Sequence, residues 1–164
     1  MLDANTPKRS LRSRLPIAIL LLAVLTWFVV SCYQQSRPLP PDLVAWRDYE
    51  SGMTAAREEG KPVFLYFTGE SWCPPCRTMQ RNVLTDPDVA DRLNGAFIPI
   101  KIDFKTPSGT DQQRALKQQY GISGTPTSLV LTSDGAVLVR EAGSMPKGDF
   151  LALLGSALPE DPAG

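Results

Sequence analysis

Two cysteines, Cys73 and Cys76, stand two residues apart at the point where an apolar run gives way to an expected helix. The run at 63–67 reads VFLYF and is flanked by turn-forming residues, which predicts a buried strand. The helix is predicted over 74–84, because an Asp-Pro pair follows it. The motif therefore lies on a strand–helix turn, and the chain must adopt a fold that builds such a turn around two thiols.

The rest of the chain alternates strands and helices in a way typical of an α/β domain. An aromatic-rich apolar stripe of Trp46, Tyr49, Met53 and Ala56 at helical spacing predicts a core-facing helix. Further strands are expected at 97–102, 128–131 and 137–141, and helices at 43–59, 88–94, 111–120 and 147–158.

The N-terminus predicts membrane targeting. Four basic residues precede position 15, and residues 15–30 are almost unbroken apolar sequence. Basic residues before such a segment stay in the cytoplasm, so the remainder is expected outside it. We divide the chain into a basic cytoplasmic leader at 1–14, a targeting segment at 15–32, a proline-rich linker at 33–42, a globular domain at 43–159 and a tail at 160–164.

Two kinds of attachment fit the targeting segment equally. In one, residues 15–32 form an uncleaved anchor helix. In the other, Val29-Val30-Ser31-Cys32 resembles a relaxed lipobox, where bacterial lipoproteins are cleaved and lipidated on cysteine. Cys32 can also be read as a small apolar residue at a helix end. Both attachments tether the domain at an oxidising face of the membrane.

The element order, with Cys-x-x-Cys at the first strand–helix turn, resembles thioredoxin. The resemblance rests on WCPPC at 72–76, KID at 101–103, YGISGTPT at 120–127 and AGSMPKGDFLALL at 142–154. Residues 67–89 are most similar to the periplasmic thioredoxin-like domains of Dsb-type thiol:disulfide interchange proteins. This similarity implies a thioredoxin fold for the domain, with a central mixed β-sheet flanked by helices, behind the N-terminal membrane-targeting segment.

The chemistry of the cysteines independently supports a redox role. A thiolate attacks disulfides, and a helix N-terminus lowers the pKa of a cysteine placed there. Cys73 is expected to be the exposed nucleophile and Cys76, one turn on and more buried, the resolving thiol. A structural disulfide gains little from so short a loop. A zinc site needs more ligands, and the chain has no histidine and one other cysteine, so neither metal nor cofactor is expected.

A second functional element follows from the resemblance. It implies a cis bond before Pro126, with this proline against the active-site sulfurs, and backbone pairing between Thr125 and an extended substrate. Trp72 and Gly143 would flank the same groove, although Trp72 can equally be a packing residue.

The expected strand at 63–67 carries no acid, whereas thioredoxin and many interchange domains have a buried aspartate there that relays the proton of the resolving cysteine. Glu70, three residues before Cys73, is the nearest carboxylate. It is either a substitute proton acceptor or a solvated loop charge.

The two prolines of the motif predict a direction of electron flow. Pro74 and Pro75 have no N–H group, so they remove two donors that would stabilise a thiolate at Cys73 and leave the Cys76 N–H as the nearest. Strong oxidants of this fold depend on a heavily stabilised thiolate. We therefore expect a reduction potential of roughly −270 mV rather than −120 mV.

The sequence thus predicts a membrane-tethered thiol–disulfide oxidoreductase in the bacterial periplasm that reduces protein disulfides and receives electrons from a membrane donor. Oxidation of secreted chains and a non-catalytic adaptor that holds client proteins remain alternatives. A metallochaperone is disfavoured, because the 4 methionines are scattered. The 17 basic and 17 acidic residues cancel, so charge indicates no nucleic-acid partner.

Overall fold

The computed structural model describes residues 15–36 and 38–158. The contacts within it divide the chain into two units, one that ends at Pro38 and one that begins at Leu39. The predicted leader at 1–14 and tail at 160–164 lie outside the described residues.

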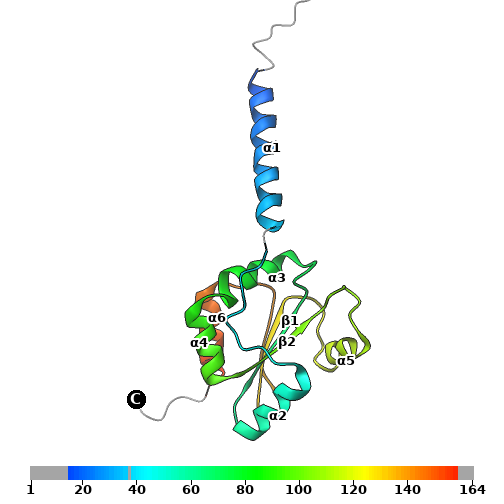
Figure 1. Ribbon diagram of the computed structural model, residues 1–164, viewed down its shortest axis with the longest axis vertical. Coiled ribbons are helices and arrows are strands. Elements are labelled where there is room, and N and C mark those ends of the chain that lie inside the picture. Colours follow the sequence, from blue (N-terminus) through cyan, green and yellow to red (C-terminus); the bar gives the residue numbers. More distant parts are fainter. Residues whose placement is uncertain (1–14, 37, 159–164) are drawn as a thin grey trace, which may run out of the picture. The chain divides into compact units, whose positions relative to one another are not determined.

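The first unit is the helix α1, Leu15–Ser36 (Figure 1). Its 22 residues give a length of about 33 Å, close to the roughly 30 Å of a bilayer's hydrocarbon core. The stretch Pro16–Tyr33 has a mean hydropathy of 2.2, so by length and composition it can cross a membrane, as a signal sequence also can. The helix continues past Cys32, so the first residues of the predicted linker are helical.

The second unit is built on a four-stranded mixed sheet with the strand order β2-β1-β3-β4 (Figure 1). The strands are β1 at Val63–Thr68, β2 at Ile98–Asp103, β3 at Thr127–Leu131 and β4 at Val137–Ala142. Strand β2 runs parallel to β1, whereas β3 pairs antiparallel with both β1 and β4. The expected central mixed sheet is thus confirmed.

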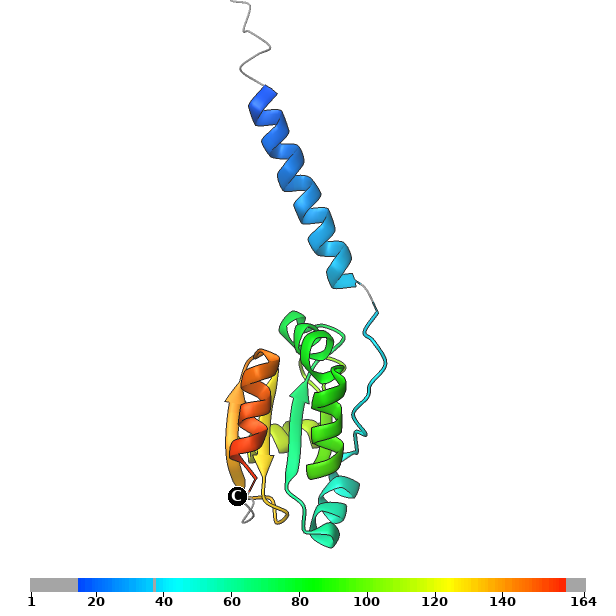
Figure 2. The same cartoon turned by 90° about the vertical axis from the view of Figure 1, so that its left-hand side faces the viewer.

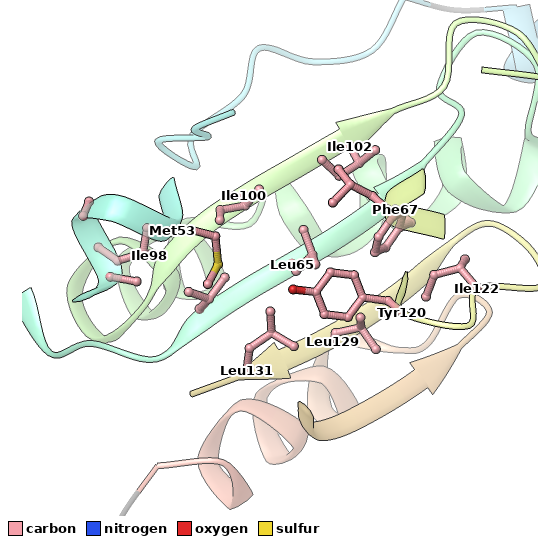
Figure 3. Close-up of a cluster of buried hydrophobic side chains, with 14 of the residues drawn as sticks. Met53, Leu65, Phe67, Ile98, Ile100, Ile102, Tyr120, Ile122, Leu129 and Leu131 are labelled. Carbon is pink, nitrogen blue, oxygen red and sulfur yellow. The ribbon is translucent and has the colours of Figure 1, made fainter. Parts of the chain in front are cut away.

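Strand β1 is buried along its whole length, and its side chains belong to two hydrophobic cores. Its odd-numbered residues Val63, Leu65 and Phe67 join a cluster with the helices α2 (Tyr49–Glu59) and α5 (Asp111–Gln119), part of which Figure 3 shows. Its even-numbered residues Phe64 and Tyr66 join a second cluster with the helices α4 (Pro87–Ala96) and α6 (Lys147–Ser156). Successive side chains of a strand point to opposite faces, so helices must cover both sides of the sheet. Figure 2 shows α4 and α6 in front of the strands and α5 behind them.

The helices begin where the sequence supplies caps. Asp86 caps α4 by accepting from the Asp88 N–H, and Thr110 and Gln113 form a capping box at α5. The helix predicted at 74–84 is interrupted, because its second half is π-helical. The helices are α2 at Tyr49–Glu59, α3 at Pro74–Met79, the π-helix η2 at Gln80–Leu84, α4 at Pro87–Ala96, α5 at Asp111–Gln119 and α6 at Lys147–Ser156.

The helix predicted at 43–59 is wrong in its first six residues. Asp48 caps the start of α2 by accepting from the Ser51 N–H, and the residues before it are not helical. The backbone of Arg47 pairs with β2, where its N–H donates to the Pro99 carbonyl at 2.9 Å. Trp46 packs with the second core cluster, so the expected aromatic stripe is divided between the two faces of the sheet.

Gly52 allows α2 to approach the sheet closely. A Cβ atom at this position would lie 2.4 Å from Cγ1 of the fully buried Ile100, and that β-branched side chain has no room to move. Gly95 is the matched control, since it lies in α4, is exposed, and its Cβ would meet nothing within 4 Å.

We predict that Gly52→Ala lowers the free energy of unfolding by about 1–3 kcal/mol through overpacking. Gly95→Ala should raise it by up to about 1 kcal/mol, because alanine favours helix. Urea unfolding of the full chain in mild detergent, followed by tryptophan fluorescence, measures both. Equal effects of the two substitutions would contradict the close approach of α2.

Candidate active site

The motif loop joins the carboxyl end of β1 to α3 and is held by its own backbone. The Gly69 carbonyl accepts hydrogen bonds from the N–H groups of Trp72, at 3.0 Å, and Cys73, at 2.8 Å. Cys73 is the N-cap of α3, and Pro74 and Pro75 occupy the first two helical positions, where no intrahelical donor is lost. Cys73 and Cys76 form a disulfide.

Two backbone groups lie against the sulfur of Cys73. The Cys76 N–H points to Cys73 Sγ at a distance of 3.3 Å. This N–H is the one nearby donor expected from the sequence. On the other side, the Thr125 carbonyl oxygen lies 3.5 Å from the same sulfur. The bond between Thr125 and the buried Pro126 is cis, as the resemblance implied. Segments far apart in sequence thus meet at Cys73.

Both cysteines are buried in this disulfide form. Cys73 exposes 3% of its surface and Cys76 exposes none, so the expectation that Cys76 is the more buried is confirmed. The expectation that Cys73 is exposed is wrong for this form, because the backbone at Thr125 lies against its sulfur.

Trp72 is both packed against the motif loop and exposed beside it. Its indole N–H donates to the Phe104 carbonyl at 2.7 Å, and its ring lies so close to Gly69 that a Cβ there would be 2.5 Å away. At the same time its side chain remains 38% exposed and lines a hollow beside the motif. Packing thus fixes the ring at the edge of the site.

Glu70 is held by charged neighbours on β2. Its carboxylate accepts from Lys101 Nζ at 3.1 Å, and its backbone N–H donates to Asp103 at 3.1 Å. Lys101 also binds Asp42, from the extended segment before α2, at 2.7 Å. The Glu70 side chain is only 19% exposed, so it is not the solvated loop charge considered from the sequence. Lys101 thus ties the motif loop to the segment that leads into the domain.

The carboxylates of Glu70 and Asp103 affect the pKa values of two neighbouring side chains. Burial, and to a smaller extent the charges of Glu70 and Asp103, raises the pKa of the Tyr66 hydroxyl above its usual value. A hydrogen bond to Asp103 raises the pKa of Lys105. Tyr66 therefore stays neutral, and Lys105 stays charged, throughout the physiological range.

A hollow of about 310 Å³ opens directly beside the motif. Trp72 and Thr125 line it, so two of the residues expected at a substrate groove are brought together there. Gly143 does not line it, and its N–H instead donates to the Pro126 carbonyl at 2.8 Å. The other residues of the lining include Phe104, Pro107, Lys117 and Ser123.

Sequence reasoning missed the contributions of Lys101, Asp103 and Phe104. The signal was present, since these residues lie at the end of, or directly after, the strand predicted at 97–102, and the carboxyl ends of parallel strands meet at one edge of a sheet. Cys32 belongs to the other unit. Within the described ranges, no group of three or more His, Cys, Asp or Glu is placed to hold a metal ion.

The fold and the motif turn are those of one family. Residues 49–158 match the family model described as a thioredoxin-like domain, which is more than half of the chain. The protein therefore belongs to the thioredoxin-like domain family, as its resemblance to thioredoxin implied.

The relatives of the chain include Dsb-type proteins. It is 26% identical over 112 residues to the disulfide bond reductase DsbH of Chlamydia pneumoniae, covering 65% of this chain and 68% of DsbH. It is 34% identical over 86 residues to the thiol:disulfide interchange protein DsbD 1 of Pseudomonas aeruginosa, covering 52% of this chain but 14% of DsbD 1. A solved structure of a DsbH oxidoreductase matches with a TM-score of 0.62 and 25% identity, covering 77% of this chain and 92% of that one.

The position of Glu70 allows its role to be tested. We predict that Glu70→Gln leaves the pH dependence of disulfide exchange unchanged, because the carboxylate is paired with Lys101 rather than with either sulfur. Glutamine can still accept the lysine's hydrogen bond, which preserves the loop. Exchange rates measured from about pH 5 to pH 9 give the profile. A displacement by about one pH unit would instead assign proton transfer to this carboxylate.

Proposed function

We propose that this protein is a membrane-tethered thiol–disulfide oxidoreductase that reduces protein disulfides in the bacterial periplasm. The observation that carries the proposal is the Cys73–Cys76 disulfide at the start of α3, in contact with the Thr125 carbonyl and beside an open hollow. The similarity to Dsb-type interchange proteins supports the same chemistry. The reaction needs no cofactor or metal, because the dithiol itself carries the two electrons.

Each turnover begins with the reduced pair. The Cys73 thiolate attacks one sulfur of the substrate disulfide, forms a mixed disulfide and releases the other sulfur as a thiolate. The Cys76 thiolate then attacks Cys73 Sγ, which closes the Cys73–Cys76 bond and releases the second substrate thiol. Two electrons pass from the protein to the substrate, and a membrane-bound dithiol donor returns them.

The proposed direction rests on the few donors around Cys73. The Cys76 N–H is the one donor of the first helical turn that points to this sulfur, since Pro74 and Pro75 have none. A thiolate with little stabilisation makes the dithiol the less favoured state, so the pair gives up electrons readily. The printed name of the relative DsbH, a disulfide bond reductase, agrees with this direction.

The tether is the apolar helix α1. Its length and hydropathy suit a membrane span, and the basic residues before it favour a cytoplasmic N-terminus. Both the uncleaved helix and lipidation at Cys32 would keep the domain at the outer face of the membrane. An exported domain meets oxidising conditions, where misformed disulfides are the substrates that a reductant serves.

We predict different outcomes for the two cysteines. Cys73→Ala should abolish exchange, because no nucleophile remains at the helix start. Cys76→Ser should permit one attack and then accumulate the mixed disulfide. Reduction of insulin disulfides measures turnover, and non-reducing electrophoresis with mass spectrometry detects the trapped partner. Equal residual activity in the two variants would refute the assigned roles, and an inert unmodified protein would favour an adaptor.

Cys32→Ser distinguishes the two tethers. If Cys32 is lipidated, we expect the variant to accumulate as an unprocessed precursor and to lose incorporated fatty acid. Electrophoretic mobility and metabolic labelling with a palmitate analogue measure both, and Ser31→Ala is the matched control. Unchanged mobility, together with no label in the original protein, leaves the uncleaved helix as the anchor.

A further inference from the structure

The hollow beside the motif continues along α5. Pro107, Lys117 and Ser123, which line it, also line a second hollow of about 730 Å³ that extends to Arg114 and Ile122. We call these two connected hollows the α5 groove. The groove extends well past the disulfide, so a substrate must contribute more than its two sulfurs to fill it.

The charged residues that line the α5 groove are all basic. None of the residues that line it is acidic, whereas Arg114 and Lys117 are basic. The two lie three residues apart on α5, a spacing that places side chains on one helix face.

The two basic side chains differ in what they already bind. The guanidinium of Arg114 donates to the Gly109 carbonyl at 2.8 Å and pairs with Asp111. The ammonium group of Lys117 has no hydrogen bond or ion pair within the part of the chain that the structure describes, and the residue is only partly exposed. A cation in this position is available for an acid that a ligand brings.

Resting on the thiol–disulfide exchange proposed above, we infer that the α5 groove selects protein substrates by charge and that Lys117 is the specificity-determining residue. The groove receives the segment of polypeptide that flanks the attacked cysteine, and Lys117 pairs with an aspartate or glutamate of that segment. Trp72 and Pro107 provide apolar contacts to the same segment. A charge pair at such a partly enclosed site is less screened than one in open water.

The test uses the prereduced full-length protein in mild detergent and three peptide disulfides. Each peptide carries Glu, Gln or Lys near its cysteine, and the released thiol reports a second-order rate constant without any added reductant. We expect the Glu peptide to react roughly three- to tenfold faster than the Lys peptide at low salt. The difference should shrink as the ionic strength rises.

Substitutions assign the preference to one side chain. Lys117→Gln should abolish the preference for the Glu peptide, and Lys117→Glu should reverse it. Lys61→Glu is the control for Lys117→Glu, because both substitutions change the net charge by the same amount. Lys61 precedes β1 and thus lies at the strand end remote from the motif, so this variant should keep the preference.

The outcomes separate this inference from the proposed function. Equal rates for the three peptides with the unmodified protein, or a preference that survives Lys117→Glu, would overturn the role of Lys117 while leaving the exchange chemistry intact. Failure of every peptide to react with the unmodified protein would overturn the proposed function, and the inference with it.

Discussion

The burial of β1 on both faces is the constraint on which the rest of the structure depends. Alternate side chains of this strand enter two separate cores, so β1 cannot shift by one residue without exchanging all of them. Burial of each large apolar side chain contributes about 1.5–3 kcal/mol, which makes this register costly to change. The carboxyl end of β1 is therefore a fixed point, and the motif loop with Cys73 begins there.

Three sets of contacts surround this end of β1. The Gly69 carbonyl orders the loop from within, Lys101 of β2 holds Glu70, and the Thr125 backbone lies against the sulfur. None of these contacts supplies a charge next to Cys73. The sulfur thus sits in a rigid frame with one N–H donor directed at it, which is the physical basis for the reducing character that we propose.

Much of this arrangement was predictable from the sequence, because the signals were local. The apolar run of β1, the Asp-Pro cap of α4 and the Cys-x-x-Cys turn each depend on neighbouring residues. The start of α2 was not predictable from the sequence, since backbone pairing with β2 keeps Arg47 out of the helix. The Lys101 network and the α5 groove likewise depend on tertiary contacts between distant segments.

The reduction potential of the Cys73–Cys76 pair tests the central claim most directly. The purified protein would be equilibrated with mixtures of reduced and oxidised glutathione, and the fraction of dithiol measured by thiol alkylation and mass. A single N–H donor at Cys73 predicts a potential near the thioredoxin end of the scale, at roughly −270 mV. A potential near −120 mV would contradict the proposed direction and show a strongly stabilised thiolate at Cys73.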